Sequence, residues 1–335
     1  MIDIGRVPKK NIYYMIGTFI LLFACLLFMG AGARASAAEE AVDAYLTKDM
    51  DITPAEPVSS DLAVLQSVTK LASKRWIQSF TCDSEYYYYI QMTNPKKGHL
   101  RITRVKYTGL GRYIKDHMDL LYFGHATNLD CSVYNGVTYL WTGSDCASGS
   151  DVTRAITCFP YKKGKTLRHH GAIRYRIPKG KWGKYVTNVY PAINEKSNKL
   201  AVRFTYHGRQ YFQTYKLTYG TRIDVRKMLK QKAFAPTVGD FQGFDLYGSH
   251  TIYTIEGSPN KAFLKVYDKT RVFQKTIIRT CNLYDGSTIS RTIKGAKKLS
   301  FREPEGIKML KGRNMQIMFV SFRLTDQSCN IYRVK

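Results

Sequence analysis

The sequence lacks the short motifs that mark the common catalytic and metal sites. It has no G-x-S-x-G nucleophile elbow, no H-E-x-x-H, no P-loop and no G-x-G-x-x-G fingerprint. It also has no C-x-x-C pair and no histidine at the spacing of a zinc site. Asp145 and Asp151 flank a Ser/Gly loop that could hold calcium, but the EF-hand spacing is missing. We therefore predict a protein that is not an enzyme and that binds no cofactor and no metal.

Acidic residues are also scarce. The 25 Asp and Glu residues face 52 Lys and Arg residues, which gives a formal net charge of +27 at pH 7. Residues 1–75 contain equal numbers of acidic and basic side chains, so the whole excess lies in residues 76–335. Such a basic region is expected to bind polyanions with an affinity that falls as salt rises. The alternative is a solvated basic surface that only maintains solubility.

An apolar run near the N-terminus, IYYMIGTFILLFACLLFMG, follows Arg6, Lys9 and Lys10 and is succeeded by small residues. This order is typical of a secretory signal peptide. We predict a cleaved signal peptide in residues 1–35, a short acidic linker or N-terminal extension in residues 36–74, and a secreted, extracellular protein. An uncleaved N-terminal anchor is the alternative.

Export changes how the cysteines are interpreted, because secreted proteins keep disulfides. The number of cysteines beyond the signal peptide is even, which predicts disulfide pairing, and several pairings are open. The candidate cysteines are Cys82, Cys131, Cys146, Cys158, Cys281 and Cys329.

The rest of the chain is rich in strand-forming residues and contains five clusters with the same order of features. In each cluster a polar opening leads into a short strand, a turn and further strands. Repeated multi-strand units are typical of the blades of a propeller. We therefore predict an all-β fold, a five-bladed β-propeller in residues 75–335. The openings are marked by Gln78, His125, Asn188, Gln242 and Glu305.

Three segments carry a family resemblance: FGHATNLDCSVYNGVTYLWTG, FQGFDLYGSHTIYTIEG and REPEGI. Their order and spacing resemble the helveticin J-like bacteriocins and the related propeller domains of phage receptor-binding and teichoic-acid-associated proteins. The resemblance spans residues 75–335. It implies a five-bladed propeller and, for the helveticin branch, a bacteriocin that kills related Gram-positive bacteria. The cysteines and the strong basicity do not map onto the family's motifs, which leaves the target open.

The five openings are expected to meet around the central channel, because the innermost strand of each blade lines it. Glu305 near His125 would form a charge-assisted pair. Glu303 and Glu305 share a strand, with Pro304 between them, and alternation points both to the same face. The glycines after Gln242 and Glu305 are expected to allow close backbone approach. Three interpretations of this ring are open: a structural polar network, a site for a small ligand or cation, and catalysis as in glycoside hydrolysis.

A second candidate surface is basic and aromatic. Residues 160–185 interleave Lys and Arg with Tyr and Trp, a combination that binds phosphates and places aromatic faces on sugars or headgroups. The polyanion-binding candidates are Lys162, Lys163, Lys165, Arg168, Arg174, Arg176, Lys179, Lys181, Trp182 and Lys184. Residues 221–234 have the apolar spacing of a short amphipathic helix, which would pack on the propeller or insert at a membrane surface.

These observations favour a secreted antibacterial protein of the helveticin J type that binds anionic envelope polymers of related Gram-positive bacteria. The expected partners are teichoic or lipoteichoic acid or an anionic membrane surface, with an immunity protein as a possible further partner and no nucleic acid. The alternatives are a non-toxic secreted adhesin that binds the wall and a wall-polymer hydrolase.

Overall fold

The computed structural model describes residues 62–68, 71–107, 115–146, 149–176, 186–297, 299–310, 314–321 and 328–334. The predicted signal peptide lies outside these ranges. Strands predominate within them, beside the helix α3 (Lys261–Tyr267) and the short 3-10 turns η1 (Pro95–Lys97) and η2 (His169–Gly171). No helix among the described residues has the length and apolar character needed to cross a membrane.

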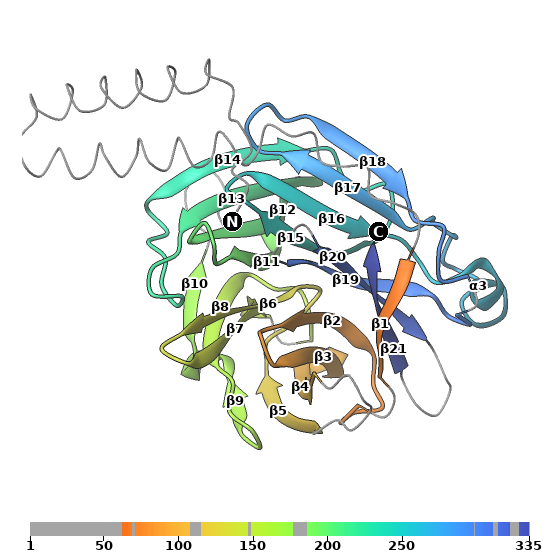
Figure 1. The fold of residues 1–335 in the computed structure, drawn as a ribbon, viewed down its shortest axis with the longest axis horizontal. Helices are drawn as coiled ribbons and strands as arrows, with labels where there is room; N and C mark the ends of the chain where they lie inside the picture. Colours follow the sequence, from red (N-terminus) through yellow and green to blue (C-terminus); the bar gives the residue numbers. More distant parts are fainter. Residues whose placement is uncertain are drawn as a thin grey trace, which may run out of the picture. The chain divides into compact units, whose positions relative to one another are not determined.

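The strands form five sheets, each of which extends outward from one innermost strand (Figure 1). From the inside outward, the first sheet contains β2 (Ile77–Cys82), β3 (Tyr86–Asn94), β4 (His99–Lys106), β5 (Lys115–Leu121) and β9 (Thr166–Arg168). The second contains β6 (Leu129–Tyr134), β7 (Val137–Ser144), β8 (Ala155–Pro160) and β10 (Ile173–Arg176). The third contains β11 (Thr187–Asn194), β12 (Lys199–Tyr206), β13 (Arg209–Lys216) and β14 (Met228–Phe234). The fourth contains β15 (Phe241–Tyr247), β16 (Thr251–Glu256), β17 (Ile277–Asn282) and β18 (Thr288–Thr292). The fifth contains β19 (Glu303–Leu310), β20 (Asn314–Ser321), β21 (Ser328–Val334) and β1 (Leu62–Val68).

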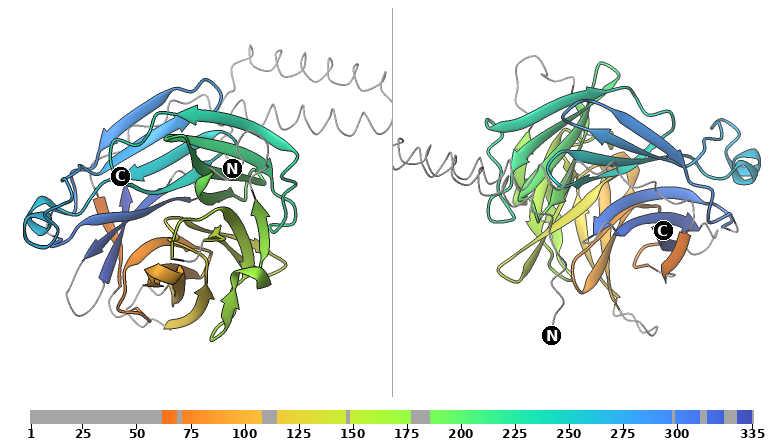
Figure 2. Two further views of the ribbon diagram at one scale, coloured as in Figure 1. Left: turned by 180° about the vertical axis from the view of Figure 1, so that it is seen from behind. Right: turned by 45° about the horizontal axis from the view of Figure 1, so that its top comes forward.

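The innermost strands close a ring. β2 contacts β6, β6 contacts β11, β11 contacts β15, β15 contacts β19, and β19 contacts β2 again. The two further views in Figure 2 show the same sheets from behind and from a tilted direction. The predicted five-bladed β-propeller is confirmed, and β19, which contains Glu303 and Glu305, is the innermost strand of the last blade.

Two strands pair with a sheet whose other strands are not their neighbours along the chain. β1 pairs antiparallel with β21 and so completes the last blade with residues from the other end of the propeller. It lies inside the 36–74 segment predicted as a linker, so the propeller begins before residue 75. Only Gln66 and Val68 of β1 are buried, which explains its weak strand signal. β9 leaves the second blade and pairs parallel with β5 of the first.

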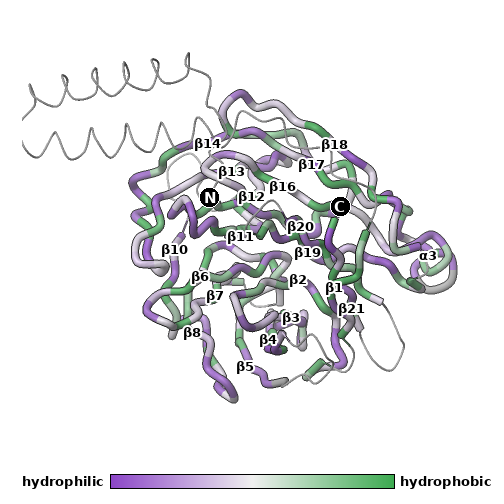
Figure 3. The backbone as a smooth tube through the Cα atoms, in the orientation of Figure 1, coloured by the Kyte–Doolittle hydropathy of each residue, from purple (hydrophilic) through white to green (hydrophobic). Residues whose placement is uncertain are grey.

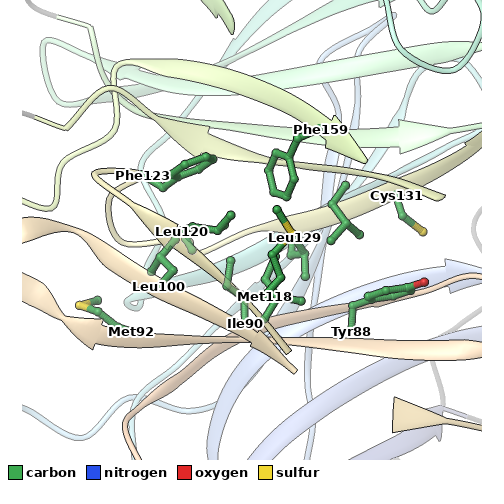
Figure 4. Close-up of a cluster of buried hydrophobic side chains, with 13 residues drawn as sticks. Tyr88, Ile90, Met92, Leu100, Met118, Leu120, Phe123, Leu129, Cys131 and Phe159 are labelled. Carbon is green, nitrogen blue, oxygen red and sulfur yellow. The ribbon is translucent and has the colours of Figure 1, made fainter. Parts of the chain in front are cut away.

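The core consists of apolar layers between neighbouring blades. Each of the five buried clusters draws its side chains mainly from two adjacent sheets. β3 supplies two layers at once: Tyr87 and Tyr89 face the last blade, whereas Tyr88 and Ile90 face the second. Figure 4 shows the second of these layers, where Tyr88 and Ile90 lie below Leu129 and Phe159. Because alternate residues of a strand point to opposite faces, such central strands are apolar on both sides. Figure 3 shows how hydropathy varies along the strands.

The predicted disulfides are absent. No disulfide joins Cys82, Cys131, Cys146, Cys158, Cys281 or Cys329 in the described part of the chain. Five of these residues are buried, and they are distributed over four different inter-blade layers, where a thiol packs as a small apolar group. Burial raises the pKa of the Cys82 thiol to about 11 and that of Cys281 to about 12. The even count therefore reflects core packing and not pairing.

The prediction of a short amphipathic helix in residues 221–234 is also wrong. Residues 228–234 form β14, the outermost strand of the third blade, which pairs antiparallel with β13. Met228 and Leu229 are exposed on this edge strand. Pairing with an available sheet edge overrides the helical spacing of a few apolar residues.

Candidate functional site

A β-bulge near the start of an innermost strand recurs in four blades. The ladders shift register at Ile77/Ser79, Thr187/Tyr190, Phe241/Gly243 and Pro304/Ile307. These shifts contain four of the predicted openings, Gln78, Asn188, Gln242 and Glu305. A bulge leaves a residue outside the regular pairing and redirects its side chain. The repeated openings in the sequence therefore correspond to a repeated backbone irregularity at the channel.

Two glycines allow the bulged strands to approach closely. Gly243 and Gly306 have φ values of 140° and 131°, which L side chains rarely adopt. A Cβ on Gly243 would lie 3.3 Å from the Cα of Gly306, and a Cβ on Gly306 would lie 3.0 Å from Cδ1 of Phe80. The expectation that glycine is needed at these two positions is confirmed.

Three of the four bulged ends, those of β2, β15 and β19, line a cavity of about 570 Å³. Four of the five predicted ring residues line it: Gln78, His125, Gln242 and Glu305. The other lining residues are Trp76, Ile77, Asp240, Phe241, Phe263, Asp268, Arg271, Phe301, Glu303 and Val320. We call this space the channel-mouth cavity. Its volume is in the range of sites for small molecules.

Arg271 organises the acidic side of the channel-mouth cavity. Its Nη2 atom donates to Glu303 Oε1 at 2.8 Å and to Asp240 Oδ2 at 2.7 Å. Gln242 Nε2 donates to the same Glu303 oxygen at 3.2 Å. Burial raises the pKa of the Glu303 carboxyl, and Arg271 offsets part of that rise. The Arg271 guanidinium and the Glu303 carboxyl group thus connect β15 of the fourth blade to β19 of the fifth.

Glu305 has no comparable partner among the described residues. Its side chain is buried, and in that part of the chain nothing forms a hydrogen bond with its Oε2 atom. Burial and then the neighbouring Glu303 carboxyl raise the pKa of Glu305 well above its usual range. Burial therefore favours the protonated form of this carboxyl group over a wider pH range than in an exposed glutamate.

Two details of the predicted ring differ from the structure. His125 does not pair with Glu305, because its Nδ1 lies 2.7 Å from Oδ2 of Asp151. That contact lowers the pKa of the Asp151 carboxyl. Asn188 does not line the cavity; it adopts a φ of 54°, and its carbonyl accepts a long contact of 3.5 Å from Arg203.

A buried ionic cluster lies further along the innermost strands. Lys308 Nζ lies 2.6 Å from Asp130 Oδ1 and 3.4 Å from Asp245 Oδ1. Burial alone would lower the pKa of Lys308, but the two carboxylates raise it above its usual value. Asp130 also accepts from the Ile193 amide at 2.6 Å and from the Thr81 hydroxyl at 3.2 Å. These residues come from all five innermost strands, so the cluster fastens the five blades at the channel.

The basic segment forms a second cavity, of about 420 Å³, between the first and second blades. Lys162, Lys165 and Thr166 line it beside apolar residues that include Tyr139 and Phe159. The described residues around this space include no carboxylate. We call it the basic pocket.

The backbone around the basic pocket is fixed by the first blade. The amide of Gly164 donates to the carbonyl of His117 at 2.7 Å, and the amide of Asp119 donates to that of Lys165 at 2.9 Å. Lys162, Lys163 and Lys165 are nevertheless exposed. The turn is therefore anchored while its ammonium groups face solvent.

Other predicted polyanion-binding residues are differently placed. Arg174 and Arg176 both bind Asp145, at 2.8 and 2.9 Å, and His169 Nδ1 lies 3.0 Å from the same carboxylate. His169 thus has an acidic neighbour that the sequence does not reveal. In the structure Asp145 thus pairs with basic side chains, and Asp151 pairs with His125. Arg168 is exposed, whereas Lys179, Lys181, Trp182 and Lys184 lie outside the described residues.

The comparison with known proteins points to one family. The family described as the phage 5-bladed beta propeller receptor binding platform domain matches residues 76–322. Among solved structures, the tail fiber of Staphylococcus aureus phage P68 is 18% identical, with a TM-score of 0.58. The match covers 82% of this chain and 52% of that chain, so the present chain spans about half of the tail fiber.

Two propeller enzymes are more distant matches. An alpha-L-arabinofuranosidase from Lactobacillus brevis is 9% identical with a TM-score of 0.46, and 76% of this chain and 89% of that chain are covered. A thermostable family-43 glycoside hydrolase is 10% identical with a TM-score of 0.45, and the coverage is 84% and 92%. No curated protein sequence matches. With its five sheets, its closed ring and a family match over most of its length, the chain belongs to the phage five-bladed propeller receptor-binding platform family.

Proposed function

We propose that this protein attaches to Gram-positive cells by binding anionic envelope polymers, teichoic or lipoteichoic acid, at the basic pocket. The observation that carries the proposal is a cavity lined by Lys162 and Lys165 and by no described carboxylate, on an anchored turn. Membership of a receptor-binding family supports an attachment role and a protein that binds without catalysis.

The chemistry of the pocket suits a polymer of phosphodiesters. Each phosphate carries a negative charge that an ammonium group can neutralise, and the aromatic wall offers an apolar surface to the linking polyol. The net charge of +27 would draw such a polymer toward the propeller over a distance set by the ionic strength. Binding should therefore weaken steadily as salt is added.

The test compares two double variants with equal loss of charge. Lys162→Ala/Lys165→Ala removes the pocket ammonium groups, whereas Lys294→Ala/Lys297→Ala removes two exposed ones outside the pocket. We expect the first to lower affinity for purified lipoteichoic acid about tenfold, since an exposed ion pair contributes up to about 1 kcal/mol. The control should lose much less. Equal losses in both variants would show that only overall charge matters.

The resemblance to helveticin J-like bacteriocins extends the proposal from attachment to killing. In that case the protein acts outside the producing cell, which requires export, and the producer needs protection such as an immunity protein. Counting viable Gram-positive cells after adding purified protein separates the two activities. A loss of viability supports a bacteriocin, whereas binding with unchanged counts supports an adhesin. Release of phosphate or reducing sugar from walls would instead support the hypothesis that the protein is a wall-polymer hydrolase.

A further inference from the structure

The channel-mouth cavity has an unmet hydrogen-bonding need. Four buried side-chain atoms lack a partner among the described residues, and only Oε2 of Glu305 belongs to a residue that lines this cavity. A buried oxygen without a partner carries a desolvation cost that a bound donor would remove. The position of Glu305 on a bulge at the channel end keeps this carboxyl group at the cavity.

The charge of this cavity is opposite to that of the whole chain. Its described lining includes the carboxyl groups of Asp240, Asp268, Glu303 and Glu305 but a single guanidinium, that of Arg271. Arg271 pairs with Asp240 and Glu303. His125, the other basic residue in the described lining, pairs with Asp151. None of the ion pairs between described residues involves Glu305. An anionic ligand would meet these carboxyl groups and is disfavoured.

Aromatic side chains complete the lining. Trp76 is 52% exposed, so it is accessible to a ligand. Phe263 and Phe301 meet edge to face with their centroids 4.5 Å apart. The negative faces of aromatic rings attract organic cations, most strongly where water is excluded. Carboxyl groups and aromatic rings around one cavity are the chemistry that recognises an alkylammonium group.

We propose that the channel-mouth cavity binds an organic ammonium group, with Glu305 as its counter-ion and Trp76 among its aromatic contacts. A primary ammonium has three donors, which matches an acceptor without a partner beside further carboxyl oxygens. Burial raises the pKa of the Glu305 carboxyl and disfavours its charge, whereas a bound cation stabilises the carboxylate. This site is separate from the basic pocket, so an experiment can refute the proposal for one site and leave the proposal for the other intact.

The test uses a pair of ligands that differ in one group. Ethanolamine carries an ammonium where ethylene glycol carries a hydroxyl, and saturation-transfer NMR on the whole protein measures both at neutral pH. We expect ethanolamine to bind and ethylene glycol to bind at least about tenfold more weakly, because charge-assisted hydrogen bonds are about twice as strong as neutral ones. Equal binding of the two ligands, or no binding of ethanolamine, would overturn the proposal.

The variants locate the site. Glu305→Gln keeps the shape of the side chain, and a neutral residue suits a buried position where the pKa of the carboxyl is raised. We expect it to lower ethanolamine affinity about tenfold or more. Glu85→Gln, at an exposed glutamate outside the cavity, should leave affinity unchanged, as should Lys162→Ala/Lys165→Ala. Thermal unfolding checks that each variant is folded. Unaltered binding by folded Glu305→Gln would refute the assignment.

Discussion

Replacing Lys308 by methionine should destabilise the propeller strongly. The side chain of Lys308 is 10% exposed, and those of Asp130 and Asp245 are 2% and 1% exposed, so all three are removed from water. Methionine keeps most of the side-chain volume but leaves two buried carboxylates without a cation. Breaking a buried ion pair in this way costs about 3–5 kcal/mol. For a domain of this size the midpoint of thermal unfolding should fall by about 6–20 °C.

Urea unfolding of Lys308→Met at several pH values tests this reasoning. The loss should shrink as pH falls, because acid neutralises the two carboxylates that the variant leaves unpaired. The control is the uncharged triple variant Asp130→Asn/Asp245→Asn/Lys308→Met, which should regain most of the stability, since it contains no buried charge at this position. A loss below about 1 kcal/mol, or one that does not change with pH, would refute the role of the cluster.

Three further predictions concern other parts of the propeller. The pKa of Glu305 is raised in the folded state, so the free energy of unfolding of the wild-type protein should fall as pH rises above the ordinary glutamate pKa. Urea unfolding should show a smaller fall for Glu305→Gln, which lacks this carboxyl group. Adding dithiothreitol should not change the midpoint of thermal unfolding, because the described cysteines form no disulfide; a drop of several degrees would contradict this. Gly306→Ala should cost about 1–3 kcal/mol, since its φ is 131° and a Cβ would crowd Phe80. Calorimetry should show a smaller loss for Gly208→Ala, because its φ of 72° also strains a side chain but a Cβ there meets nothing within 4 Å.

The blade repeat could be predicted because its determinants are local. A polar residue at a bulge, followed in two blades by glycine, recurs at the start of the innermost strands, as at Gln242 and Glu305. The alternation of apolar residues then defines the strands that follow. The same local signals place Gln78 and Glu305 at one cavity once the ring is closed.

The contacts that complete the site could not be predicted, because they join residues far apart in the chain. Lys308 and Asp130 are separated by 178 positions, and neither belongs to a recognisable motif. Arg271 follows α3 in a connection between strands, and Trp76 precedes the first blade, so neither shares the repeat that revealed the openings. Lys308 is the one cation in β19, among residues that are mostly buried, and this was the local feature that could have indicated the cluster.

The cysteines and β1 show how context changes the meaning of a local pattern. Cys82 and Cys131 lie close enough for the Cys131 thiol to contact the Cys82 carbonyl at 3.2 Å, yet they are not bonded to each other. β1 resembles a linker in sequence because much of its length is exposed, and it becomes a strand only through pairing with β21. Both outcomes depend on the closed ring and not on the neighbouring sequence.

The most direct test of the proposed function is retention of the protein on Gram-positive cell walls before and after chemical removal of their teichoic acid. The basic pocket predicts strong retention on intact walls, progressive release as salt rises, and little retention on stripped walls. Undiminished, salt-resistant retention on stripped walls would show that the receptor is another wall component and that the basic pocket is not the attachment site.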